Sequence, residues 1–164
     1  MNDKELKNLR EKAAREKARN KSFLKKLKRL KNKRKLDEMV HQLHDDVFEY
    51  IDCLECANCC KNISPIIYEK DIQRIAKQLK IKPSEFTERY LSMDDDGDFV
   101  FNETPCPFLL PDNYCSIYSI RPRSCREYPH TDRKNMQQIL DLTLKNTFIC
   151  PAVYDIVMEL RKHY

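Results

Sequence analysis

Cysteine is the residue type with the most chemistry to offer in this chain of 164 residues, which contains eight of them. Four fall within eight consecutive positions as C-x2-C-x2-C-C, and four more follow at wide spacing. The eight are Cys53, Cys56, Cys59, Cys60, Cys106, Cys115, Cys125 and Cys150. Chance explains such a cluster poorly, and thiolate is the form of cysteine that binds metals. The sequence predicts a metal centre in which the first four cysteines are the primary set and the others complete one or two sites.

The spacing of the cysteines leaves the metal open between zinc and iron. Zinc takes four Cys or His ligands in a tetrahedron, and eight thiols would serve two such ions. The spacing is also compatible with an iron–sulfur cluster, because C-x2-C-x2-C resembles the cysteine motif of ferredoxins, in which a remote Cys-Pro supplies the remaining ligand. Both Cys106-Pro107 and Cys150-Pro151 have that form. The adjacent pair Cys59-Cys60 fits a simple ferredoxin badly, since neighbouring residues rarely ligate one ion comfortably.

Positive charge accompanies one of the candidate ligands. Arg121, Arg123 and Arg126 surround Cys125 in the sequence. Guanidinium N–H groups of this kind can orient sulfur ligands and stabilise their negative charge. No catalytic set is recognisable beside them, and the single glycine of the chain excludes the glycine-rich loops that bind nucleotide phosphates. The sequence leans away from an enzyme for these reasons.

The charge distribution divides the chain at about residue 36. Residues 1–36 hold 16 Lys and Arg against four Asp and Glu, whereas residues 37–164 hold 15 against 22. The first part consists of strong helix formers without Pro or Gly, and its apolar stripe is thin. We expect a long basic helical arm over residues 1–36 and a cysteine-cluster domain over residues 37–164. The arm is a candidate docking element for an acidic partner, either a protein or a nucleic acid.

The elements that must position the cysteines are mainly helical. Apolar periodicity predicts helices over residues 36–51 and 68–80, a short helix with Ser84 as its N-cap, and a closing helix over residues 152–164. Residues 99–101 read as a short strand after a turn at 94–97. Five prolines make residues 104–130 irregular, apart from a hairpin turn at 111–113. The predicted fold is therefore mainly α, with a small β-hairpin and irregular loops that metal–thiolate bonds tie together.

Two further expectations follow from what the sequence lacks. The longest stretch without charge is the nine residues Asn146–Tyr154, so no segment is long enough to span a bilayer. The first 22 residues contain no apolar block of the secretory kind. A chain with many thiols and no export signal is expected in the cytoplasm, where thiols stay reduced.

Several linked motifs over residues 48–154 resemble one family, the YkgJ-type CxxCxxCC cysteine cluster proteins. The resemblance rests on the C-x2-C-x2-C-C run, Asp71-Ile72, Pro105-Cys106-Pro107, Cys115 with Arg121-Pro122, Ser124-Cys125-Arg126, Tyr128-Pro129 and Cys150. It implies zinc or iron chelation and no particular reaction. One departure is Ala57, where the family usually has glycine, and an alanine is strained there if the position needs a positive φ.

An enzymatic alternative comes from a second resemblance. The cysteine cluster is similar to that of flagellin lysine-N-methylase, and this similarity implies an iron–sulfur-dependent enzyme that modifies a protein lysine. The similarity ends at the cluster, because this chain has no glycine-rich loop for S-adenosylmethionine. A structural or chelating metal protein is the first hypothesis, and the modifying enzyme is the alternative.

Overall fold

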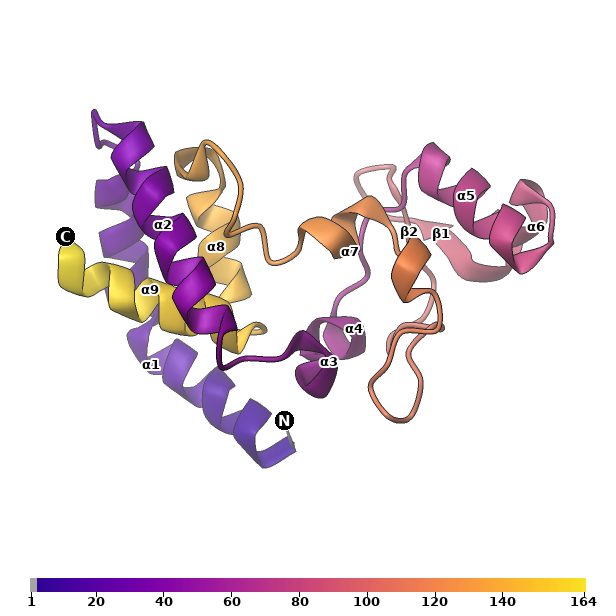
Figure 1. Cartoon of the computed structure of the whole chain (residues 1–164), viewed down its shortest axis with the longest axis horizontal. Coiled ribbons are helices and arrows are strands. Elements are labelled where there is room, and N and C mark those ends of the chain that lie inside the picture. The colour runs from indigo at the N-terminus through magenta and orange to yellow at the C-terminus, as the bar shows by residue number, and fades with distance from the viewer. Residues whose placement is uncertain (1–2) are drawn as a thin grey trace. The chain divides into compact units, whose positions relative to one another are not determined.

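Figure 1 shows the computed structural model of the chain, which describes residues 3–164 and is mainly helical with one small antiparallel hairpin. The elements, in chain order, are α1 (Asp3–Leu27), α2 (Lys33–Phe48), α3 (Cys53–Cys56), α4 (Asn58–Asn62), α5 (Glu69–Leu79), α6 (Pro83–Tyr90), β1 (Leu91–Met93), β2 (Phe99–Phe101), the 3-10 turn η1 (Tyr118–Ile120), α7 (Arg123–Glu127), the 3-10 turn η2 (Met136–Ile139), α8 (Leu140–Asn146) and α9 (Pro151–His163). The predicted fold class is confirmed, as is the long basic helix at the N-terminus.

The chain forms two compact units. Unit 1 consists of Met1–Cys56 and Pro129–Tyr164, and unit 2 consists of Ala57–Tyr128. This division differs from the one that charge predicts at residue 36, because α1 and α2 pack together with the C-terminal helices. Burial of apolar side chains, rather than charge, determines which segments form a unit.

Unit 1 is a group of helices around an aliphatic core. α2 packs against α9, and α1 packs against both α8 and α9. The core side chains of α2 and α9 are fully or nearly fully buried: Leu36, Val40, Leu43 and Val47 from α2, and Ala152, Val153, Ile156, Val157 and Leu160 from α9. These positions recur at three- and four-residue steps, so each helix presents one apolar face to the core.

The N-terminal helix is not a solvated arm. Its thin apolar stripe is buried, and it comprises Leu6, Leu9, Ala13, Leu24 and Leu27. Polar residues, among them Glu16 and Asn20, interrupt this apolar stripe. Arg161 of α9 contacts both of them, donating to Glu16 at 2.5 Å and to Asn20 at 3.1 Å. α1 ends at Leu27 instead of continuing to residue 35, and Gln137 donates to the backbone oxygens of Leu27 and Leu30 at this end.

Unit 2 has its own core, built by α5, α6, the hairpin and the loops that follow. The buried cluster consists of Ile67, Ile72, Ile75, Ala76, Phe86, Leu91, Phe101, Phe108 and Ile117. The ring of Phe108 is stacked with that of Phe86 and tilted by 58° relative to that of Phe101, with centroid distances of 6.3 and 5.6 Å. Cys106 and Cys115 are partly buried and pack against this cluster, so the core of unit 2 holds two of the eight cysteines in place.

The two strands of the small hairpin lie on either side of the turn at residues 94–97, and the first of them, Leu91–Met93, is a strand that the sequence does not predict. β1 pairs with β2 across the turn at residues 94–97, where Gly97 has a φ of +83°. The predicted strand at 99–101 is confirmed. The expected turn at 111–113 is also confirmed: an antiparallel bridge joins Leu109 to Cys115, and the N–H of Leu110 donates to the carbonyl of Tyr114 at 2.8 Å, although no regular strands flank the turn. Pro107 and Pro111 remove backbone donors there, which prevents a longer ladder.

Two smaller differences concern helix ends and membrane segments. Ser84 is not the N-cap that the sequence predicts: α6 begins at Pro83, with Lys82 at the capping position. Proline at the first helical position has no N–H to satisfy, so the helix starts two residues earlier than an N-cap at Ser84 implies. Over residues 3–164, none of the helices combines the length and apolar character that crossing a membrane requires.

Candidate metal centre

The eight cysteines are present as free thiols and are shared between the two units. Cys53, Cys56 and Cys150 belong to unit 1, and Cys59, Cys60, Cys106, Cys115 and Cys125 belong to unit 2. The boundary falls inside the C-x2-C-x2-C-C run, after its second cysteine. The residue at this boundary is Ala57, whose φ is +46°. Left-handed backbone of this kind has a steric cost for a residue with a Cβ.

The unit 2 thiols come from four separate segments that the backbone brings together. Cys59 and Cys60 lie on α4, and their sulfur atoms are 3.9 Å apart. The N–H of Cys106 donates to the carbonyl of Cys60 at 2.8 Å, which fastens the proline-rich loop to α4. The Leu109–Cys115 bridge brings the next cysteine back along the same loop. Cys125 follows on α7.

Four of these thiols influence one another's pKa. Burial, with smaller contributions from the sulfurs of Cys60, Cys106 and Cys115, raises the pKa of Cys125 to about 12. Burial likewise raises the pKa of Cys106 to about 11, with smaller contributions from Cys60 and Cys115. Several thiolates in one half-buried place repel each other and lack solvation. A bound cation removes both penalties, which is why metal binding and thiol deprotonation occur together.

Cys60 differs from the other unit 2 thiols. Its hydrogen bond with Cys59 lowers the pKa of Cys60 to about 7, and its own backbone N–H and the Lys61 ammonium act in the same direction against burial. A thiol with this pKa is partly ionised at neutral pH. It is therefore the member of the group best prepared to bind a metal ion first.

The unit 1 thiols form a second, smaller group. Cys53 and Cys56 are the two ends of α3, whose first turn is held by a 2.7 Å hydrogen bond from the N–H of Leu54 to Asp52. Cys150 precedes the first residue of α9 and is buried. Burial raises the pKa of Cys150 to about 12, and the charges of Cys53 and Cys56 also raise it. These three thiols thus belong to one unit and are coupled electrostatically.

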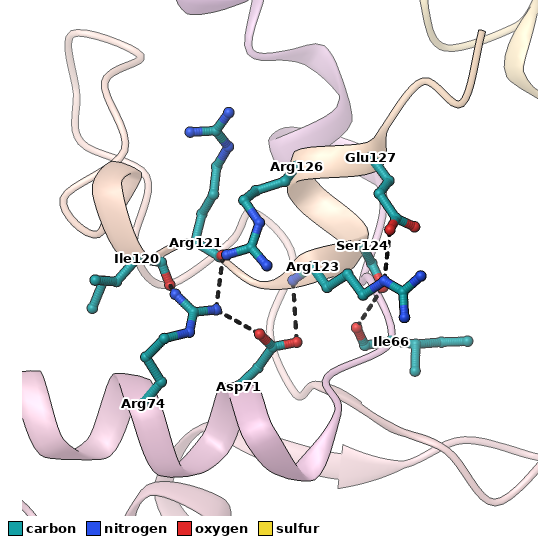
Figure 2. A network of polar contacts seen from close by, with 9 residues as sticks. All are labelled: Ile66, Asp71, Arg74, Ile120, Arg121, Arg123, Ser124, Arg126 and Glu127. Atoms are coloured by element: carbon teal, nitrogen blue, oxygen red, sulfur yellow. Dashed lines mark hydrogen bonds and ion pairs between the residues drawn. The ribbon is translucent and has the colours of Figure 1, made fainter. Parts of the chain in front are cut away.

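A polar network positions the segment that carries Cys125. Figure 2 shows the Asp71 carboxylate of α5 between Arg74 and the start of α7, where it accepts the backbone N–H of Arg123 at 3.1 Å. Arg74 donates to Asp71 at 2.5 Å and to the carbonyl oxygens of Ile120 and Arg121. Asp71 itself is buried. The network fixes the backbone between Cys115 and Cys125 without touching either sulfur.

The arginines around Cys125 have distinct roles. The guanidinium of Arg121 lies 3.9 Å from the ring centroid of Tyr118, and its positive charge opposes the burial that raises the pKa of Cys115 and Cys125. Arg123 pairs with Glu127 at 2.6 Å, and Arg126 donates to the carbonyl of Arg121 at 3.2 Å. The contribution of charge expected from all three is thus carried mainly by Arg121, while Arg123 and Arg126 stabilise the local backbone.

The histidines near the cysteine run serve the packing of unit 1. His41 contacts the carbonyl of Arg133 at 2.9 Å, and His44 contacts the hydroxyl of Thr131 at 2.7 Å. Among residues 3–164, moreover, no three Cys, His, Asp or Glu side chains are arranged so that they could hold a metal ion as they stand. The donor chemistry suits zinc and iron, but the sulfurs must draw closer around the ion.

The comparison with known protein families agrees with this thiol chemistry. Residues 52–146 match the CxxCxxCC family, described as "Putative zinc- or iron-chelating domain". The chain belongs to this family. Seven of the eight cysteines lie inside the matched region, and Cys150 follows four residues after its end. Membership in the CxxCxxCC family supports metal binding.

Relatives of known sequence add little about function. The chain is 33% identical over 82 residues to an uncharacterized protein of Methanocaldococcus jannaschii, an alignment that covers 48% of this chain and 44% of that protein. The chain thus spans less than half the length of this relative. No solved structure matches the chain. The CxxCxxCC family is the part of the comparison that bears on chemistry.

Sequence reasoning singled out every cysteine but gave no role to Asp71 and Arg74. Both residues stand on one face of α5 at i and i+3, and a short-range Asp–Arg pair on a helix is usually read as a solvent-exposed ion pair. Only the long-range contacts to residues 120–123 reveal that this pair holds the Cys125 segment. No local signal in the sequence distinguishes the two cases.

Proposed function

We propose that this protein is a zinc- or iron-chelating module whose principal site is formed by Cys60, Cys106, Cys115 and Cys125. The observation that carries the proposal is the convergence of these four thiols within unit 2, from segments that span 65 residues of sequence. Four thiolates are the donor set that zinc takes in closed structural sites. Cys59, at 3.9 Å from Cys60, is the fifth thiol of the group.

The metal at this site is zinc or iron, and the same four thiols also match the ligands of an iron–sulfur cluster. Support for a thiolate-binding metal comes from the raised pKa values of Cys106 and Cys125, which burial and neighbouring thiols keep protonated in the absence of a cation. A metal ion or cluster supplies the positive charge that lets these thiols ionise together. Cys60, which has the lowest pKa of these thiols, is the first to bind the metal ion. Arg121 adds positive charge beside Cys115 and Cys125. The Asp71–Arg74 pair holds the backbone at residues 120–123 in place.

The role of this metal is structural or chelating. The segment 102–122 contains no helix longer than one 3-10 turn and no strand, so backbone hydrogen bonds alone hold it weakly. A metal that joins Cys106, Cys115 and Cys125 to Cys60 would fasten this segment to α4 and α7. In small domains such metal staples commonly supply a large part of the stability.

Cys53, Cys56 and Cys150 extend the proposal to a second set of ligands in unit 1. Their proximity is supported by the mutual effect of their charges on the pKa of Cys150. Cys53 is exposed, whereas Cys150 is buried. This second set is the one that explains why the chain has eight thiols when one tetrahedral ion needs four.

The location and partner proposed for the protein follow from its thiols and its charge. Free cysteines persist in a reducing compartment, which supports a cytoplasmic location. All 16 Lys and Arg residues among positions 1–36 are exposed, although the helix that bears most of them is packed into unit 1. The docking of an acidic protein or nucleic acid is thus proposed for the exposed face of α1 and the turn that follows.

Cobalt titration tests the proposed unit 2 site. Cobalt(II) replaces zinc in thiolate sites and gives sulfur-to-metal charge-transfer absorption, so metal-free protein should develop this absorption with a defined stoichiometry. Cys125→Ser should lose one binding site, while Met93→Ser, which changes an exposed sulfur-containing side chain of unit 2, should titrate like the parent. Unchanged absorption in both Cys125→Ser and Cys106→Ser would show that these thiols do not bind the metal.

A further inference from the structure

A cavity of about 500 Å³ lies within unit 1, bordered by α1, α3, α9 and the segment that joins α2 to α3. This volume is in the range of sites that bind small organic molecules. Cys56 is one of the lining residues, but most of the others are acidic, aromatic or aliphatic. The lining residues show which class of molecule the cavity suits.

The charge of the lining is strongly negative. Four carboxylates face one ammonium group among the described lining residues: the carboxylates are those of Glu5, Asp52, Glu55 and Asp155, and the ammonium is that of Lys12. This imbalance stands out because α1, which forms one wall, is otherwise basic. A cavity that gathers negative charge on a basic helix concentrates cations at that place.

The rest of the lining is aromatic and aliphatic. Tyr50 and Tyr154 contribute rings, and Leu9, Ile51 and Pro151 contribute apolar surface. Aromatic rings favour organic cations, and aliphatic side chains favour methylene groups. Carboxylates separated by apolar surface therefore match a chain in which ammonium groups alternate with short methylene segments.

Asp155 is the half-buried carboxylate of this lining that contacts one of the tyrosines. The hydroxyl of Tyr50 donates to its Oδ2 at 3.4 Å. Asp155 is half-buried, and this burial raises its pKa above the ordinary value, while the Tyr50 hydrogen bond and the Lys12 charge oppose the increase. A carboxylate with incomplete solvation gains more from an incoming cation than an exposed one does.

The dispersion of the carboxylates favours an elongated cation. They come from α1, from the start of α3 and from α9, and they surround a space much larger than the coordination shell of one metal ion. We propose that this cavity binds a linear aliphatic polyamine, whose ammonium groups pair with the carboxylates and whose methylene segments lie against the tyrosine rings and apolar side chains. The proposal concerns unit 1 alone and does not depend on which metal the thiols bind.

Isothermal titration calorimetry of the full chain with spermidine at low ionic strength tests the proposal. The expected result is saturable binding of one spermidine per chain, with n-butylamine, which carries a single charge, binding much more weakly. Asp155→Asn should weaken spermidine binding about tenfold, because it removes the carboxylate that Tyr50 and the ligand share. Lys12→Gln, at an exposed position, should tighten binding about twofold through the loss of repulsion.

Glu38→Gln is the matched control. It removes one negative charge from the exposed surface of α2, outside the cavity lining, and should leave the affinity unchanged. The proposal is overturned if spermidine shows no saturable binding, if n-butylamine binds as tightly, or if Glu38→Gln weakens binding as much as Asp155→Asn. Should Asp155→Asn fail to fold, the tighter binding expected for Lys12→Gln, compared with the unchanged affinity expected for Glu38→Gln, still decides the outcome.

Discussion

Asp71 caps a helix to which it does not belong. Its carboxylate accepts the backbone N–H of Arg123, the first residue of α7, at 3.1 Å. The residue that precedes α7 is Pro122, whose side chain has no acceptor to offer the helix. A residue 52 positions earlier in the sequence thus supplies the missing cap. Through this one contact, α5 sets where α7 begins and so where Cys125 lies.

Replacing Asp71 should therefore destabilise unit 2 and weaken metal binding together. Asp71→Ala leaves the Arg123 N–H without its acceptor and Arg74 without its carboxylate, in a buried place. We expect a loss of about 2–4 kcal/mol in the free energy of unfolding, measured by urea denaturation. Glu127→Gln removes the exposed ion pair with Arg123 and should cost less than about 1 kcal/mol. Equal losses in the two variants would contradict the capping role.

Ala57 offers a test of the turn that separates the second and third cysteines. Its φ of +46° is tolerated by alanine at some cost and is much less accessible to a β-branched side chain. Ala57→Val should lower the free energy of unfolding by about 2 kcal/mol or more. Ala57→Gly should stay close to the parent, because relief of backbone strain offsets the loss of a buried methyl group. Thermal denaturation of both variants gives the comparison, and a Val variant as stable as the Gly variant would contradict it.

The low pKa of Cys60 predicts selective reactivity in metal-free protein. The hydrogen bond with Cys59 lowers the pKa of Cys60 to about 7, whereas burial raises the pKa of Cys106 to about 11. Iodoacetamide at pH 7 should therefore alkylate Cys60 well before Cys106, and the rate at Cys60 should reach half its maximum near pH 7. Cys59→Ala should move this midpoint upward. Peptide mass spectrometry after timed alkylation measures both rates, and a midpoint near 9 in the parent chain would refute the assignment.

The same pKa has a consequence for stability with a definite sign. Because the pKa of Cys60 is lower in the folded chain than its ordinary value of 9.0, the folded state favours the thiolate. The resulting stabilisation is fully present above about pH 9 and is lost as the pH falls to about 7. The raised pKa values of Cys106, Cys125 and Cys150 act in the opposite direction, because near pH 9 these thiols ionise in the unfolded chain but not in the folded one. The contribution of Cys60 is therefore read from a comparison of variants: the difference in urea midpoint between pH 9 and pH 7 should be more positive in the metal-free parent chain than in Cys59→Ala. A Cys59→Ala variant with the full difference would assign the pH dependence to other groups.

Much of the fold could be predicted because its signals are local. The apolar positions Ile72, Ile75 and Ala76 recur at helical spacing, and α5 forms as that spacing indicates. Pro151 likewise marks the start of α9. The place of α1 could not be predicted in the same way, because its thin stripe is completed by a distant residue. Arg161 fills the polar gap at Glu16 and Asn20, and only the folded chain brings them together.

The candidate site could be predicted in its chemistry but not in its grouping. Eight cysteines with this spacing indicate metal binding from sequence alone, and membership in the CxxCxxCC family agrees. The sequence treats the C-x2-C-x2-C-C run as one ligand set. In the folded chain Cys56 belongs to unit 1 and Cys59 to unit 2, on either side of Ala57, while the grouping of the cysteines around metal ions stays a prediction. Such a division depends on contacts made by residues far along the chain, such as Cys106 with Cys60.

Metal content is the most direct test of the central claim, that the thiols of this chain chelate zinc or iron. The protein should be purified without oxygen, and its zinc, iron and acid-labile sulfide should be measured per chain, with Cys125→Ser alongside. We predict zinc, or iron with or without matching sulfide, bound in defined amounts to the parent chain and at a reduced level in Cys125→Ser. A parent chain that carries neither metal, or a Cys125→Ser variant with unchanged metal content, would contradict the account.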